Sequence, residues 1–127
     1  MTKETFVKEF MSGRLLLHGD QSPEFYKFCD WIEESCSLNH RDAWYGDGYI
    51  HSIADYCREW LQTPYCLLFF DVGLKSLNGY EFDPDEYEHK TRIINGQLRF
   101  VDENKPIIDW HDVLAENTDS VHFETLI

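Results

Sequence analysis

Apolar side chains in the first half of the chain recur at spacings of three and four, the period of an amphipathic helix. Three helices are predicted, and each carries a start or stop signal. The first runs from a capping Thr2 to Met11 and stops at Gly13, the second begins at Ser22-Pro23, and the third ends at Thr63-Pro64. Their apolar stripes are Phe6, Phe10 and Met11; Phe25, Phe28, Cys29, Ile32 and Cys36; and Ile50, Ile53, Ala54, Cys57 and Leu61.

The second half of the chain changes to the pattern of strands. Residues 65–72 are rich in aromatic and branched side chains and predict a central strand, followed by a loop over residues 73–79. Shorter segments predict a strand at residues 106–108, a helix at residues 109–117 and a last strand at residues 121–127. Residues 15–17 are compatible with either a short extended segment or a short helical one. The whole predicts a single α+β domain over 1–127, with N-terminal helices followed by a largely antiparallel β-sheet.

The clearest local prediction is a hairpin over residues 90–101, turning at Asn95-Gly96 in a type I′ turn. This turn pairs Arg92 with Arg99 and places four side chains on the core face, namely Thr91, Ile93, Leu98 and Phe100. Because two opposed arginines repel each other, we expect an acid from a neighbouring strand, or an anion, beside them.

The net charge of the chain limits the classes of partner that it is expected to bind. The 127 residues carry 24 acidic against 11 basic side chains, a formal net charge of −13. Such a field repels nucleic-acid phosphates and anionic membranes, and it speeds association with a basic protein. The alternative is that the charge only keeps the chain soluble. No apolar run is long enough to span a membrane and no signal peptide is visible, so a cytoplasmic location is expected.

The chain holds no recognisable catalytic or metal-binding motif. The four cysteines, Cys29, Cys36, Cys57 and Cys66, form no CxxC pair and are expected to be reduced core residues. The run from Asp109 to Asp112 encloses His111, but it is better explained as a helix start capped by Asp109. We therefore expect no enzyme, catalytic residue, metal or cofactor, although a site assembled from distant segments stays open.

The candidate partner-binding surface is the acidic stretch over residues 81–88, which we call the acidic segment. Tyrosines among acids are typical of protein interfaces, and five unpaired carboxylates must lie at the surface. The alternative is a solvated loop in which Asp83 caps a helix of about one turn beginning at Pro84. The candidate residues are Tyr80, Glu81, Asp83, Asp85, Glu86, Tyr87 and Glu88, with a second patch at Asp42, Trp44, Tyr45 and Asp47. Asp47 has the alternative of a plain turn between glycines.

In its acidity and in this segment, the chain resembles the immunity proteins of bacterial contact-dependent growth inhibition systems and colicins. The resemblance implies an inhibitor that binds and neutralises a cognate basic toxin domain, a nuclease, by covering its active site. Two alternatives stay open. One is a phage-type anti-defence protein that mimics nucleic acid, which the scattered acids and Lys90, Arg92 and Arg99 disfavour. The other is a small enzyme whose site is built from distant segments.

Overall fold

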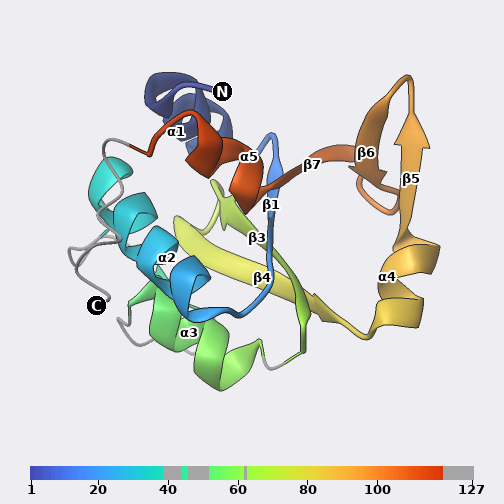
Figure 1. Ribbon diagram of the computed structural model, residues 1–127, viewed down its shortest axis with the longest axis horizontal. Coiled ribbons are helices and arrows are strands. Elements are labelled where there is room, and N and C mark those ends of the chain that lie inside the picture. Colours follow the sequence, from blue (N-terminus) through green and yellow to red (C-terminus); the bar gives the residue numbers. More distant parts are fainter. Residues whose placement is uncertain (39–43, 46–51, 62, 119–127) are drawn as a thin grey trace.

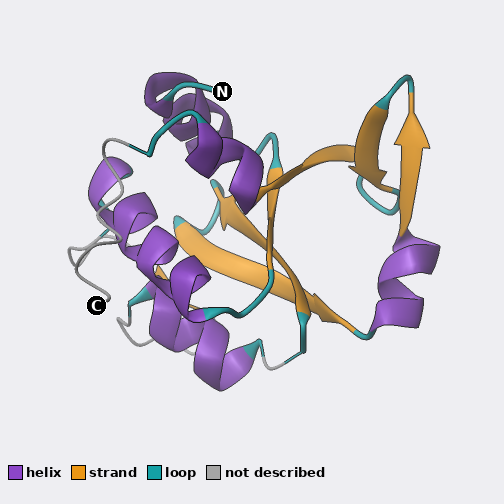
Figure 2. Ribbon diagram, in the orientation of Figure 1, coloured by secondary structure: helices purple, strands orange, loops and turns teal. Residues whose placement is uncertain are grey.

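The computed structural model describes residues 1–38, 44–45, 52–61 and 63–118. Helices and strands alternate as far as β3, and strands predominate after it (Figures 1 and 2). The helices are α1 (Lys3–Met11), α2 (Pro23–Ser35), α3 (Ile53–Trp60), α4 (Pro84–Lys90) and α5 (Trp110–Ala115). The strands are β1 (Leu16–Gly19), β2 (Trp44–Tyr45), β3 (Tyr65–Asp71), β4 (Ser76–Phe82), β5 (Thr91–Ile94), β6 (Gln97–Phe100) and β7 (Lys105–Asp109).

The N-terminal helices begin at the predicted caps. The side chains of Thr2 and Ser22 accept hydrogen bonds from the backbone N–H groups of Thr5 and Phe25, at 3.2 and 3.1 Å. Ser52 caps α3 in the same way. The apolar stripe of α2 is confirmed as core, because all of its predicted residues are buried. In the stripe of α1, Phe6 and Phe10 are buried, whereas Met11 is partly buried and packs against the core. Of the third stripe, Ile50 lies outside the described residues and the other four members are buried.

The strands form one seven-stranded sheet in the order β2-β4-β3-β1-β7-β6-β5. Only β2–β4 and β1–β7 are parallel pairs, so the prediction of an α+β chain with a largely antiparallel sheet is confirmed. Of the two alternatives for residues 15–17, the extended one is correct: Leu16 and Leu17 belong to β1, the central strand of the sheet. The predicted last strand at 121–127 lies outside the described residues.

The predicted loop over residues 73–79 is wrong, because β4 already begins at Ser76. Gly79 misled the prediction: it is a strand residue that lets another side chain approach the backbone closely. A Cβ atom on Gly79 would lie 2.5 Å from Leu61 Cδ1 and 3.2 Å from Leu68 Cδ2. The acidic segment is therefore the end of β4 followed by α4, and α4 has seven residues instead of about one turn.

The hairpin register is confirmed, including the opposed pair Arg92 and Arg99. Asn95 and Gly96 both have positive φ, 53° and 78°, as a type I′ turn requires. Placing Ile93 in the core was wrong, since it is 75% exposed. It belongs to the sheet's edge strand near the turn, and Figure 1 shows this end of the hairpin projecting away from the rest of the molecule.

In the part of the chain that the structure describes, the hairpin arginines donate to backbone carbonyls and not to an acid from a neighbouring strand. Arg92 donates to the carbonyl oxygens of Thr91 and His89, at 2.7 and 3.2 Å, which lie at the end of α4. Arg99 donates to the carbonyl of Asn104 at 2.7 Å. Carbonyls at a helix end are partly negative, so they serve the guanidinium as an acid would.

The two faces of the sheet carry separate cores. Helices α1, α2, α3 and α5 supply the larger one, in which Trp110, Phe28 and Leu68 are buried together. Figure 1 shows these four helices gathered on one side, with α4 and the hairpin apart from them. The smaller core, on the opposite face, is built around Leu67 and Phe82. Because both faces of β3 are covered, residues 65–70 read as a continuous apolar run.

All four cysteines are buried free thiols, as predicted. Burial raises the pKa of Cys36 to about 12, and it also raises the pKa of Cys29. These thiols therefore stay protonated and behave as small apolar side chains. None of the described helices has the length and apolar character needed to cross a membrane.

Candidate functional site

The sheet surface opposite the four helices is the candidate functional site, and we call it the aromatic face. Alternation along the strands decides which side chains it receives. Tyr65, Leu67 and Phe69 point to it from β3, Tyr80 and Phe82 from β4, and His18 from β1. Its buried floor consists of Leu16, Leu67, Phe82, Phe100 and Ile107, and its partly exposed layer of Tyr65, Phe69, Tyr80, Tyr87 and Leu98.

The rings of this face lie in two groups. In the first, Tyr80 lies between Phe69 and Phe100, with ring centroids 5.1 Å from each. In the second, Tyr87 of α4 stacks on Tyr65 at 4.8 Å and approaches the His18 ring at 5.3 Å. Rings at such distances attract one another and hold fixed positions, so the face is a preformed aromatic surface.

Both tyrosines of the predicted patch keep their phenolic protons at neutral pH. Partial burial and a hydrogen bond to the Glu103 carboxylate raise the pKa of Tyr80 to about 12. Burial, with the negative charge of Asp109, raises the pKa of Tyr87 to about 12 as well. The Tyr80 hydroxyl donates a hydrogen bond to Glu103 Oε2 at 3.1 Å. The two tyrosines therefore pack into the aromatic face with neutral hydroxyls, while the acids around them face water.

The acidic segment forms one border of the aromatic face. The side chains of Glu81, Asp83, Asp85, Glu86 and Glu88 are all exposed, which agrees with the expectation that they lie at the surface. The backbone N–H of Asp83 donates to Glu86 Oε1 at 3.5 Å, so these two acids also cap α4. Asp85 and Glu88 form no ion pair with the residues that the structure describes.

The basic residues nearest this border have partners within the chain. Lys90 Nζ lies 2.8 Å from Asp102 Oδ2, and Lys105 Nζ lies 3.8 Å from Glu103 Oε1. Arg92 and Arg99 bind carbonyls, as described above. The acids of α4 are therefore left as the uncompensated charge on this side, and they are available to a basic partner.

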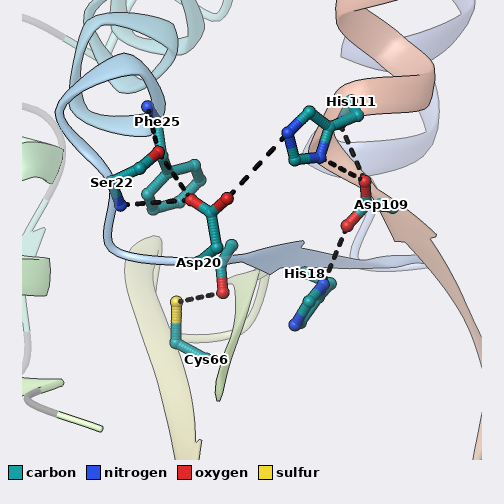
Figure 3. Close-up of polar contacts among 8 residues, drawn as sticks. His18, Asp20, Ser22, Phe25, Cys66, Asp109 and His111 are labelled. Atoms are coloured by element: carbon teal, nitrogen blue, oxygen red, sulfur yellow. Dashed lines mark hydrogen bonds and ion pairs between the residues drawn. The ribbon is translucent and has the colours of Figure 1, made fainter. Parts of the chain in front are cut away.

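A chain of acids and imidazoles lies at the edge of the aromatic face (Figure 3). Asp109 joins two histidines: Oδ1 is 2.8 Å from His18 Nδ1, and Oδ2 is 2.8 Å from His111 Nδ1. His111 Nε2 is 3.9 Å from Asp20 Oδ2. Because β1 and β7 are parallel neighbours, His18 and Asp109 lie side by side although 91 residues separate them.

The charged form of Asp109 is favoured by its two neighbours. Partial burial alone would raise the pKa of Asp109, but the hydrogen bonds with His18 and His111 outweigh it and lower the pKa below the ordinary value. Asp109 also caps α5, accepting from the His111 backbone N–H at 3.1 Å. The prediction of a helix start is confirmed. It missed His18, because no local spacing indicates a contact made between two strands.

The imidazole of His18 is poorly accessible to a substrate. His18 Nε2 is buried and has no hydrogen-bond partner among the described residues, and the rings of Tyr65 and Tyr87 lie 5.6 and 5.3 Å from the imidazole. His111 is exposed, and it lines a hollow of about 310 Å³ with Asp20 and Trp110. No group of three or more ligating side chains arranged for a metal ion occurs in the part of the chain described.

Of the second predicted patch, the structure describes only Trp44 and Tyr45. Asp42 and Asp47 lie outside the described residues. Trp44 and Tyr45 form the edge strand β2, which pairs in parallel with Ser76 and Leu77 of β4. The sequence also missed Tyr65, Phe69 and Phe100 as companions of the predicted tyrosines, since only the sheet register brings them together.

Comparison of the chain with protein-family models, with curated proteins and with solved structures finds no match.

Proposed function

We propose that this protein is an acidic inhibitor of the immunity type, which binds a basic toxin domain, a nuclease, and neutralises it by covering its active site. The observation that carries the proposal is the aromatic face bordered by the acidic segment. Partly exposed rings supply contact area with little loss of conformational freedom. The exposed carboxylates of Asp85 and Glu88, which form no ion pair with the described residues, supply charge for a basic surface.

The fixed geometry of this surface suits inhibition. Tyr87 stacks on Tyr65 and lies close to His18, and Arg92 of the hairpin donates to the carbonyl of His89 at the end of α4. A surface that is ordered before binding loses less entropy on association, which favours high affinity. The carboxylates would take the positions that substrate phosphates occupy on a nuclease. The protein would act in the cytoplasm, where its toxin exerts its effect.

A second candidate is a small enzyme, and it rests on the chain His18–Asp109–His111–Asp20. Two imidazoles joined by one carboxylate are able to pass a proton, and two distant segments, residues 18–20 and 109–111, supply the groups. This candidate is weaker, because the free nitrogen of His18 lies buried beneath tyrosine rings. Replacement of His111 by Gln separates the two candidates: an inhibitor retains its affinity for the partner.

The test of inhibition is kinetic and needs a basic nuclease domain as the partner, which is to be sought first among the genes next to this chain's own. Four amide substitutions, Asp83→Asn, Asp85→Asn, Glu86→Gln and Glu88→Gln, keep the hydrogen-bonding capacity of the acidic segment and remove its charge. We expect the association rate to fall by about tenfold at low salt and its salt dependence to flatten, since acids steer a basic partner. Surface plasmon resonance at several salt concentrations measures both, and nuclease assays measure protection.

The matched control removes the same charge from the helix-covered side, in Glu4→Gln, Glu24→Gln, Glu34→Gln and Asp112→Asn. All four of these acids are exposed, and three of them lie in the first turn of a helix, as Asp85 and Glu86 do. An equal loss in both quadruple variants would mean that net charge alone matters. A nuclease domain that is neither bound nor inhibited would refute the proposed function.

A further inference from the structure

We propose that the aromatic face contains a socket for one arginine side chain of the basic partner, formed by the Phe69 ring between the carboxylates of Asp71 and Glu103. This inference rests on the proposed function and names the chemistry of its central contact. The socket lies at the end of β3, across the aromatic face from α4, so it is separate from the acidic segment.

The first element of the socket is an unshared ring. Phe69 ends the row in which Tyr80 and Phe100 follow, and Tyr80 is the only described ring within stacking distance of it. Phe69 also lines a hollow of about 250 Å³. No other described ring covers the side of Phe69 away from Tyr80, and a planar cation stacks well on such a ring face.

The second element is a pair of carboxylates at the same hollow. Asp71 and Glu103 both line it, and their charges add to burial in raising the pKa of the neighbouring Tyr80. The carboxylates are already oriented: Asp71 Oδ1 accepts from the Leu74 backbone N–H at 3.1 Å, and Glu103 Oε2 accepts from Tyr80 at 3.1 Å. Each keeps one carboxylate oxygen for a further donor, apart from the contact of Glu103 with Lys105.

Lys105 is the internal cation of this hollow. Its Nζ lies 3.8 Å from Glu103 Oε1, too far for a hydrogen bond, and its side chain is 33% exposed. A long pair of this kind, partly exposed to water, contributes little to stability. Lys105 therefore holds the site only weakly, and an incoming guanidinium that reaches both carboxylates and the ring replaces it.

The site distinguishes arginine from lysine. A guanidinium is planar, is weakly hydrated, stacks on aromatic rings and donates in two directions, which matches a ring between two acids. A lysine ammonium is a compact and strongly hydrated charge, and gains little from the ring. The partner is accordingly expected to present an arginine here, whereas the acidic segment serves either cation.

The experiment compares nona-arginine with nona-lysine, two peptides of equal charge, by fluorescence anisotropy with the full chain at low ionic strength. We expect nona-arginine to bind more tightly. The variant Asp71→Asn with Glu103→Gln should lose about tenfold in nona-arginine affinity, the size expected for a charge-assisted contact. The control Glu4→Gln with Glu34→Gln, which removes the same charge from the helix-covered side, should lose less than about twofold.

Two further variants separate ring from charge. Phe69→Leu should abolish the preference for arginine and leave the affinity for nona-lysine unchanged. Lys105→Met removes the internal cation and should tighten nona-arginine binding several-fold, and this variant tests the socket even if Phe69→Leu proves unstable. Equal effects of the two double variants, or a preference for arginine that survives Phe69→Leu in a folded protein, would overturn the socket. Failure of both peptides to bind the wild-type chain would count against the proposed function itself.

Discussion

The two faces of this sheet use aromatic residues in opposite ways. Under the helices, Phe28, Phe6 and Trp110 are almost completely buried. On the aromatic face, Phe69 and Tyr80 are only half-buried, and acids lie around them. The first arrangement supports the fold. The second leaves part of each ring exposed beside charge, and the proposed function rests on this arrangement.

The largest expected effect compares one phenylalanine from each face. Phe28→Ala should destabilise the protein by about 3–5 kcal/mol, because it empties space in a packed core. Phe69→Ala should destabilise it by about 1–2 kcal/mol, since the Phe69 ring is already partly in water. Urea unfolding monitored by circular dichroism measures both. Equal losses would mean that the aromatic face is as much a structural core as the helix-covered one.

The next effect concerns Gly19, where β1 meets α2 under the helices. A Cβ atom at Gly19 would lie 2.2 Å from Cζ of the buried Phe25 ring. Gly19→Ala should therefore destabilise the fold by about 1–3 kcal/mol through overpacking. The double variant Gly19→Ala with Phe25→Leu should be more stable than the sum of the single effects, as a thermal-melt double-mutant cycle would reveal. Strict additivity would contradict the close contact.

The smallest effect is a pH dependence at the edge of the aromatic face. The hydrogen bonds of His18 and His111 lower the pKa of Asp109 in the folded state despite its partial burial. A lowered carboxyl pKa stabilises the fold above the unfolded pKa, near 4, and this contribution disappears as pH falls through the folded pKa. Asp109→Asn should therefore flatten the acid side of a stability profile from pH 6 to pH 2, measured by urea unfolding. An unchanged slope would show that Asp109 is not held in its charged form.

Local patterns predicted much of the fold but little of the site. Caps at Thr2 and Ser22, the helical stripes and the Asn95-Gly96 turn act between neighbours in sequence, so each was visible in the chain. Gly79 shows the limit of such local patterns. A glycine suggests a loop unless one knows that the Leu61 side chain packs directly against its backbone. Ile93 shows another: the register gives its face of the sheet, but not whether anything covers that face.

Residue types and short-range geometry were enough to predict the acidity, the starts of α1 and α2, the hairpin register and the exposure of the acidic segment. The sequence did not indicate that Tyr80 and Tyr87 join Phe69, Tyr65 and Phe100 in one aromatic face, or that His18 contacts Asp109; the folded structure shows both. The physical reason is strand order. Pairings such as β1 with β7 join segments about ninety residues apart, and the sheet as a whole selects them.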